Sequence, residues 1–403
     1  MHMTLPDTPN RSSYDVVIIG GAMMGASVAW FLADHPGFNG SVLVIERDPS
    51  YELSSTAHTN SCIRQQFSQP INVQVSQFGA RYVRNFRQFM GDDPDVPDLH
   101  FHDFGYLYLA ATQGGADALC AAQAMQVAQG AATRLMTPQQ MAQAYPFYDL
   151  SGIVLGSLGA ADEGYFDGGT MFDCWRRSAR RAGVEYIRGE VTGLEVTGVT
   201  VSAVHLADGA KISCGAVVNA AGPRAVQVAR MAGLTLPVEP RKRYTFVFEA
   251  ARPLDCDLPL TVDPSGMHVR TDGAYYMAGH PPRVDVPVAA DDFQADHDLW
   301  QDVVWPAIAN RIPQFDALKL RQSWVGHYAY NTLDQNAIIG PHPDLPNFLM
   351  INGFSGHGFQ QAPAMGRGIA EWITSGRFET LDLTPFAYDR IPAKQPLRER
   401  AII

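Results

Sequence analysis

Hydrophobic and polar positions over the first fifty residues predict a strand, a helix and a second strand. Residues 14–19 and 41–46 are short apolar runs rich in β-branched side chains, the pattern of buried parallel strands. Two glycines break the first run, and residues 23–32 then continue as an apolar helix. The pattern therefore predicts a βαβ unit with a glycine turn between its first strand and its helix.

The glycine turn, GGAMMG at residues 20–25, matches the dinucleotide-binding pattern G-x-G-x-x-G except that Ala22 replaces the middle glycine. In that pattern Gly20 permits the tight turn, and Gly25 lets the helix pack closely on the strand. The methyl group of Ala22 is compatible with a bound pyrophosphate if it points away from it. Glu46 ends the second strand, 21 residues beyond Gly25, which suits a hydrogen bond to a ribose hydroxyl. The unit thus predicts a dinucleotide site, for either FAD or NAD.

Two alternatives compete with this interpretation of the first unit. Residues 16–33 carry no charge, and their length reaches the lower limit for a membrane span. Against a membrane span, glycines interrupt the run, and Asp15 and Asp34 flank it without a lysine or arginine. The other alternative is an ordinary strand and helix of a hydrophobic core, with no bound nucleotide.

Further along the chain, the hydrophobic pattern predicts two different sheets. Residues 216–222 form a buried strand that runs into a glycine turn, and we expect this strand to rejoin the first, parallel sheet. Aromatic and β-branched residues then dominate four segments that predict an antiparallel sheet in a separate domain covering the active site: 241–250, 267–270, 274–279 and 318–328.

A second glycine cluster, GFSGHGF at residues 353–359, precedes a helical pattern that starts near residue 364. A glycine-rich loop that opens a helix directs backbone N–H groups and the positive end of the helix toward an anion. A reduced flavin carries negative charge at its N1/C2=O edge, whereas NAD has no comparable need. The second cluster therefore favours FAD over NAD as the dinucleotide.

The two glycine clusters together resemble those of the D-amino acid oxidase/sarcosine oxidase family of FAD proteins. The closer resemblance is to the mitochondrial FAD-dependent oxidoreductase-domain branch linked to assembly of respiratory complex I. It rests on IRQQFSQPIN (63–72), LPVEPRKRY (236–244), YNTLDQNAIIGPHP (330–343), GFSGHGFQQAP (353–363) and GRFETLDLTPF (376–386). These segments span most of the chain.

The resemblance implies an α/β fold with an α+β second domain. A discontinuous Rossmann-like FAD-binding domain is expected over residues 14–95, 150–235 and 326–392. A substrate domain with a mixed or antiparallel sheet is expected over residues 96–149 and 236–325. The residues that the resemblance places against FAD are Gly20, Ala22, Met23, Met24, Gly25, Glu46, Arg47, Ser54, Ser55, Thr56, Asn60, Ser61, Ile63, Val191, Ala220, Ala221, Gly222, Gly326, Gly353, Ser355, Gly356, His357, Gly358, Phe359 and Gln360.

The way in which FAD is held follows from a departure from the family pattern. Sarcosine oxidases link the flavin to a cysteine, but this chain has Gly326-His327-Tyr328 in that region and no cysteine. We therefore expect non-covalent FAD. A histidyl link through His327, or through His58 in a segment similar to the attachment region of dimethylglycine dehydrogenases, is the alternative.

The resemblance also assigns the substrate-facing residues. Arg64 occupies the place of a carboxylate-binding arginine, and a planar guanidinium both neutralises and orients a carboxylate. His268 stands where the family often has a pocket tyrosine, and Arg270 follows it on the same strand face. Gln360 replaces a lysine that contacts the substrate, which puts sarcosine itself in doubt. We expect Arg64, His268, Arg270, His327 and Gln360 to form the catalytic region.

The electron acceptor is left open between oxygen and a quinone or another acceptor. Sarcosine oxidases keep a lysine over the flavin for oxygen activation, and Met277 falls nearest to that position here. The absence of this lysine argues against an oxidase, which would use oxygen as its electron acceptor.

Composition and charge exclude several classes of protein. The 403 residues are 46% hydrophobic and 18% charged, as in an ordinary globular enzyme. A formal net charge of −11 without a strongly basic segment argues against nucleic-acid binding. Five scattered cysteines are too few for a disulfide framework or a zinc cluster, and they suit a reducing cytoplasm. We expect no bound metal, no secretory signal and no further apolar stretch long enough to span a membrane.

The sequence favours an FAD enzyme that oxidises the C–N bond of a D-amino acid or N-alkyl amino acid to an imine, which water hydrolyses. One alternative is a flavin-bearing assembly or interaction factor with little turnover. Another is a flavoenzyme that oxidises a 2-hydroxy acid with the same carboxylate clamp. The substrate's side chain and stereochemistry are not determined by these residues.

Overall fold

Strand β1 (Ser13–Ile19) lies at the centre of the first sheet in the computed structural model, which describes residues 5–401. It pairs in parallel with β2 (Val42–Glu46) on one side and β12 (Lys211–Asn219) on the other. The sheet order is β10-β11-β12-β1-β2-β9, and β19 adds to it by pairing with β12 and β18. Its other strands are β9 (Glu185–Arg188), β10 (Val191–Thr197), β11 (Thr200–Leu206), β18 (Ile338–His342) and β19 (Leu345–Asn352).

The first sheet is buried on both faces, which explains the unbroken apolar runs in its strands. Val16 and Ile18 of β1 pack into one core, whereas Val17 and Ile19 point into a second core on the opposite face of the sheet. The helices of this domain are α1 (Met23–Asp34), α2 (Pro70–Arg84), α3 (Phe86–Phe89), α6 (Gly168–Arg181), α7 (Ala225–Met231) and α9 (Gly358–Ser375). Among residues 5–401, no helix combines the length and the apolar character that crossing a membrane requires.

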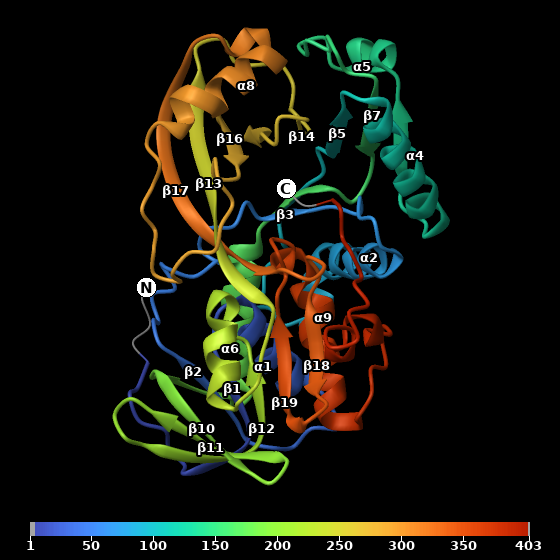
Figure 1. The fold of residues 1–403 in the computed structure, drawn as a ribbon. Coiled ribbons are helices and arrows are strands. Elements are labelled where there is room, and N and C mark those ends of the chain that lie inside the picture. Colours follow the sequence, from blue (N-terminus) through green and yellow to red (C-terminus); the bar gives the residue numbers. More distant parts are fainter. Residues whose placement is uncertain (1–4, 402–403) are drawn as a thin grey trace.

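The second sheet forms the upper domain in Figure 1, above the parallel sheet. Its strands follow the order β17-β13-β16-β15-β14-β5-β7-β6, and the parallel pair β14 and β5 makes the sheet mixed. The strands are β5 (Tyr106–Ala110), β6 (Thr133–Met136), β7 (Leu155–Gly159), β13 (Val238–Ala250), β14 (Leu260–Val262), β15 (His268–Asp272), β16 (Tyr275–His280) and β17 (Leu318–Asn331). The helices are α4 (Gln113–Ala128), α5 (Pro138–Ala144) and α8 (Trp305–Arg311).

One face of the second sheet carries the domain's core, and the other face looks toward the parallel sheet. Phe246, Phe248 and Tyr276 pack into that core with Trp300. Residues one position out of phase, such as Thr245 and His268, lie on the opposite face and line the cavity described below. The strand alternation thus separates a packed side from a side available for chemistry.

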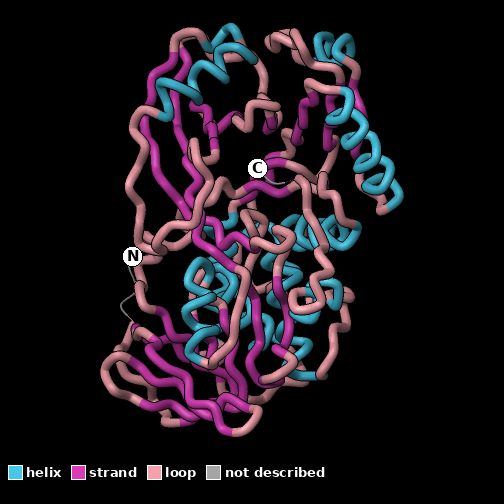
Figure 2. The backbone as a smooth tube through the Cα atoms, viewed as in Figure 1, coloured by secondary structure: helices cyan, strands magenta, loops and turns pink. Residues whose placement is uncertain are grey.

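The α/β fold class and the mixed second sheet agree with the sequence prediction, and two strands can be set beside the expected domain ranges. Strand β7 belongs to the second sheet, although its residues fall within the range expected for the FAD domain. A separate small sheet pairs β8 (Gly164–Phe166) with β3 (Cys62–Ile63) on one side and β4 (Phe101–His102) on the other. Figure 2 shows β17 descending from the upper sheet toward the lower domain, and this continuous strand spans residues 325 and 326, where two of the expected ranges meet.

Candidate flavin and substrate site

A large cavity lies between the two sheets and comprises about 2330 Å³ of empty space, its open mouth included. The sequence-predicted residues that line it are Gly20, Ala22, Met23, Met24, Glu46, Arg47, Ser54, Ser55, Thr56, Asn60, Ser61, Arg64, Val191, Ala220, Ala221, Gly222, His268, Gly326, His327, Ser355, Gly356, His357, Gly358, Phe359 and Gln360. Gly25, Ile63, Gly353 and Arg270 do not line it. The structure therefore brings nearly all of the predicted site together.

The first glycine turn is built by close backbone contacts. Gly20 has a φ of +97° and donates its N–H to the Ile45 carbonyl at 2.9 Å. A Cβ on Gly25 would lie 1.9 Å from the Gly20 carbonyl oxygen, so only glycine allows the helix to pack there. Ala22 has a φ of −70°, which is unstrained for any residue, and it lines the cavity. The methyl group at the departure from the motif is thus accommodated without strain.

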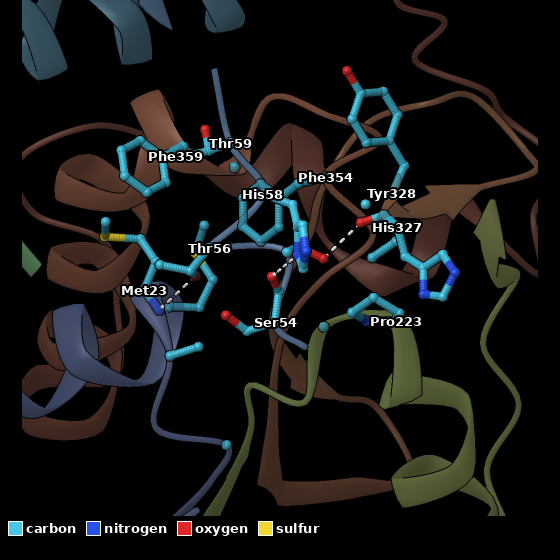
Figure 3. A pocket seen from close by; sticks show the side chains of 18 of the residues that line it. Met23, Ser54, Thr56, His58, Thr59, Pro223, His327, Tyr328, Phe354 and Phe359 are labelled. Atoms are coloured by element: carbon cyan, nitrogen blue, oxygen red, sulfur yellow. Dashed lines mark hydrogen bonds between the residues drawn. The ribbon is translucent and has the colours of Figure 1, made fainter. Parts of the chain in front are cut away.

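The N-terminus of α1 is open to an anion. The N-cap residue, Ala22, has no capping side chain, and the first turn of the helix has no acidic residue. The Met23 N–H donates to Thr56 Oγ1 at 3.2 Å, as Figure 3 shows. The other N–H groups of this first turn, beside a glycine turn, fit the diphosphate of FAD.

Glu46 holds the glycine turn in place. Its Oε2 accepts the Gly21 N–H at 2.8 Å, and its Oε1 accepts the Asp48 N–H at 2.8 Å. Burial raises the pKa of this carboxyl, although the two backbone hydrogen bonds oppose the shift. The prediction of a ribose contact is compatible with its place on the cavity wall, and the structure adds a role in fixing the turn.

The second glycine cluster forms another uncapped helix N-terminus facing the cavity. Gly356 has a φ of +95°, and a Cβ there would lie 2.4 Å from the ring of Tyr328. The helix α9 starts at Gly358, six residues earlier than the sequence pattern suggested, and no side chain caps it. Ser355 Oγ accepts the Asn331 N–H at 2.9 Å and ties the loop to β17. This loop would stabilise charge at the N1/C2=O edge of a flavin.

Two histidines border the cavity where the sequence left a covalent link open. Figure 3 shows His58 and His327 near Ser54 and Tyr328. His58 Nδ1 lies 2.9 Å from the Ser54 carbonyl oxygen, and His327 Nε2 lies 2.8 Å from the carbonyl oxygen of Asp292. His327 also stacks on Phe293, with ring centroids 4.3 Å apart, and burial lowers its pKa. Both rings are thus held by backbone carbonyls, and the non-covalent attachment of FAD stays a prediction.

Arg64 places a buried positive charge at the cavity. The residue is 3% exposed, and its guanidinium lies 4.4 Å from the centroid of the Phe67 ring. It donates through Nε to the Gln66 carbonyl at 3.4 Å and through Nη2 to the Ala401 carbonyl. Within residues 5–401 it forms no ion pair with a carboxylate. A cation held only by neutral acceptors is suited to an anionic ligand.

Gln360 lies against the backbone of Arg64. Its Oε1 accepts the Arg64 N–H at 2.9 Å and the Ser76 hydroxyl at 3.0 Å. The amide oxygen therefore positions the Arg64 segment, which leaves Nε2 as the donor for a ligand.

His268 forms part of the cavity wall under the second sheet. It is 8% exposed, and Asn60 Nδ2 donates to its Nε2 at 3.2 Å. Its Nδ1 is buried and has no hydrogen-bond partner. Burial, together with the positive charges of neighbouring residues such as Arg270, lowers the pKa of His268 to about 3. The ring is therefore a neutral hydrogen-bonding group.

Arg270 does not face the cavity as expected. Its Nη1 pairs with Asp272 at 2.7 Å, and its Nη2 donates to the Asn60 carbonyl at 3.1 Å. Its Nη2 also lies 3.4 Å from the sulfur of Met277, which is likewise absent from the cavity lining. Arg270 thus supports the loop that carries Asn60, because its own charge is already paired.

Sequence reasoning missed several lining residues of the second sheet, among them Tyr106, Arg243, Leu260 and His280. Alternation along the segment 241–250 would have placed Arg243 and Thr245 on one face. No local signal marks Ala401, whose carbonyl contacts Arg64 from 337 residues away.

The fold and cavity define an FAD-dependent oxidoreductase. The family model "FAD dependent oxidoreductase" matches residues 15–372, and the chain belongs to this family. It is similar to FAD-dependent oxidoreductase domain-containing protein 1 of Xenopus laevis, with 38% identity over 98% of this chain and 85% of that protein. The mitochondrial sarcosine dehydrogenase of Mus musculus is 26% identical over 98% of this chain and 44% of its own. The family resemblance and FAD as cofactor are therefore confirmed.

Solved structures share this fold. L-proline dehydrogenase from P. horikoshii superposes with a TM-score of 0.83 and 25% identity, covering 97% of this chain and all of that one. Glycine oxidase from Geobacillus kaustophilus gives a TM-score of 0.78 at 18% identity, with 94% and 98% covered. The name of the sarcosine dehydrogenase gives that relative a mitochondrial location. The cytoplasmic location of this chain therefore stays a prediction.

Proposed function

We propose that this flavoenzyme oxidises the C–N bond of a D-amino acid or a sarcosine-like N-alkyl amino acid. The observation that carries the proposal is Arg64, a buried guanidinium at the cavity with no carboxylate partner among the described residues. Relatives named sarcosine dehydrogenase and 4-methylaminobutanoate oxidase, and a structural neighbour named L-proline dehydrogenase, support a substrate that carries both an amine and a carboxylate.

In this mechanism the chain's own residues bind and orient the substrate. Arg64 receives the substrate carboxylate in its planar fork, and the Gln360 Nε2 donates a hydrogen bond without adding charge. Neutral His268 offers Nδ1 to a polar group of the substrate. An amine that arrives unprotonated needs no general base, so no residue is required to take a proton from it. Bound FAD supplies a hydride acceptor at N5, and water then hydrolyses the imine.

Anaerobic mixing of the yellow holoprotein with a panel of D-, L- and N-methyl amino acids tests the proposal. At least one amino acid is expected to bleach the visible flavin absorbance and to yield ammonia or an amine with the carbonyl product. The matching 2-hydroxy acids form the comparison arm, because they would give a keto acid without ammonia. If no amino acid bleaches a fully loaded protein, the proposal fails, and bleaching by 2-hydroxy acids alone would replace it.

A further inference from the structure

Residues 397–401, here called the strap, lead the chain back to the cavity. Figure 1 shows this last part of the chain, in red, rising from the lower domain to the level between the two sheets. It follows the segment that contains Arg390, which pairs with buried Asp334 at 2.7 Å. The strap therefore approaches the cavity at Arg64 from a fixed point in the FAD domain.

The buried carboxylate of Glu399 anchors the strap. Glu399 is 2% exposed, and its two oxygens lie 2.8 and 3.1 Å from the Ser68 nitrogen, whose N–H they accept. Oε2 also accepts from Asn72 Nδ2 at 2.9 Å, and Oε1 accepts the Ala401 N–H at 2.9 Å. Three donors from two parts of the chain thus converge on one buried carboxylate, and these charge-assisted hydrogen bonds hold the strap in place.

Backbone contacts hold the strap on either side of this anchor. The Leu397 N–H donates to Asp334 Oδ2 at 3.0 Å, and the Glu399 N–H donates to the Asp334 carbonyl at 3.0 Å. The Arg400 N–H donates to Ser68 Oγ at 2.9 Å. These bonds run along the strap and end at Ala401, so they direct its carbonyl.

The strap ends on two cavity residues. The Ala401 carbonyl accepts a hydrogen bond from Arg64 Nη2, and the backbone of Ala401 also contacts His357. Both side chains line the cavity. The strap thus occupies one donor of the guanidinium that the proposed function assigns to the substrate carboxylate.

We propose that the strap is a displaceable selectivity element that makes a carboxylate obligatory in the ligand. The inference rests on the proposed role of Arg64. A carboxylate that takes the guanidinium fork replaces one neutral carbonyl with two charge-assisted hydrogen bonds, and this exchange is favourable. An uncharged ligand has no comparable gain and leaves the Ala401 carbonyl in place. Amines without a carboxylate are therefore excluded by competition with the protein's own backbone.

Binding of benzoate and of benzamide to the oxidised holoprotein tests the inference without turnover. The visible flavin spectrum gives both dissociation constants, and amide hydrogen exchange followed by mass spectrometry reports on residues 397–401. In the unaltered protein, benzoate is expected to speed exchange in the strap, whereas benzamide is not.

In the variant Glu399→Gln, an amide N–H₂ group replaces one carboxylate oxygen. This new donor faces donors that had an acceptor before, so the strap is held less tightly. We expect its benzoate dissociation constant to fall by about tenfold, because the competing closed state is less populated. Benzamide is expected to gain binding at the same time. Glu379→Gln, in a partly exposed ion pair with Arg377, is the matched control and should change neither constant.

Unchanged benzoate affinity in Glu399→Gln, or strap exchange in the unaltered protein that ignores benzoate, overturns the inference. The outcome is distinguishable from failure of the proposed function. If amino acids reduce the flavin but the strap does not respond to benzoate, the proposed function stands and the inference about the strap fails. If the strap responds to benzoate but no amino acid reduces the flavin, the inference about the strap stands and the proposed function fails.

Discussion

The two ends of the cavity present different kinds of chemical group, backbone at one end and side chains at the other. The end formed by the glycine turn and α1 is made of backbone: Gly20 and Gly25 create the turn, and an uncapped helix offers its N–H groups. The end formed by the second sheet and the strap is made of buried side chains, with Arg64 and His268 as its polar groups. The first end fits a group shared by all dinucleotides, and the second end has to distinguish one substrate from another.

The difference teaches how each end tolerates change. A backbone site depends on the absence of side-chain atoms, so a single added methyl group is enough to damage it. A side-chain site depends on buried charges and hydrogen bonds whose strength is set by neighbours distant in sequence. Substitutions at the first end should therefore remove the cofactor, and those at the second end should change catalysis while the cofactor remains.

Gly25→Ala is expected to have the largest effect. Its Cβ would lie 1.9 Å from the Gly20 carbonyl oxygen, so α1 and β1 must move apart. We expect a loss of about 3 kcal/mol or more in the free energy of unfolding, and FAD content reduced severalfold. Urea unfolding and the flavin absorbance of the purified protein measure both. Gly114→Ala, where nothing lies within 4 Å of the added carbon, is the control and should keep its FAD.

Arg64→Gln tests the other end of the cavity. Removing the guanidinium should lower kcat/KM for the best amino acid by about a hundredfold or more, since a charged hydrogen bond contributes about 1.5 to 3 kcal/mol and the fork makes two. FAD content should stay the same. Arg64→Lys keeps the charge without the planar fork, so its kcat/KM should lie between those of the unaltered protein and Arg64→Gln. Loss of flavin in Arg64→Gln would instead place Arg64 in the cofactor site.

The backbone end was predictable from the sequence almost completely. The βαβ unit, Gly20, Gly25 and the second glycine cluster all follow from local patterns, because strand, turn and helix signals lie within a few residues of one another. Ala22 also fits, since its φ of −70° carries no strain. The α1 helix confirms the predicted segment and extends it by two residues to Asp34.

The side-chain end was predictable only in part. Alternation placed His268 and Arg270 on one strand face, but it could not reveal that Arg270 pairs with Asp272 and does not line the cavity. Arg176 likewise lies buried over the rings of Tyr51 and Phe172. Such pairings depend on tertiary packing between distant segments, which a single sequence does not encode in any local pattern.

Glu163 allows the electrostatics behind the substrate end to be measured through stability. Burial raises the pKa of this carboxyl from 4.5 to about 7, against hydrogen bonds from the Gln65 N–H and Gln66 Nε2. Between pH 4.5 and 7 the folded state therefore binds more protons than the unfolded state, and the free energy of unfolding falls as pH rises.

Glu163→Gln removes this titration. We expect its unfolding free energy to decline less between pH 5 and 7, by up to about 2 kcal/mol relative to the unaltered protein. Urea unfolding at several pH values measures the difference, with Glu379→Gln as the control. A steeper decline in the variant would show that Glu163 stays ionised in the folded protein, with the charge of Arg64 outweighing its burial.

His268→Leu is expected to have the smallest effect and the most specific signature. The change removes the unpartnered Nδ1 and keeps much of the bulk, so kcat/KM should fall by about tenfold, the value of one neutral hydrogen bond. Because the pKa of His268 is lowered to about 3, the ring stays neutral from pH 5 to 8. The tenfold loss should therefore be the same at every pH in that range, and His205→Leu, on β11, should show no loss. A loss that grows below pH 6.5 would mean that the protonated ring acts on the substrate, and the substrate end would then depend on charge at two residues instead of one.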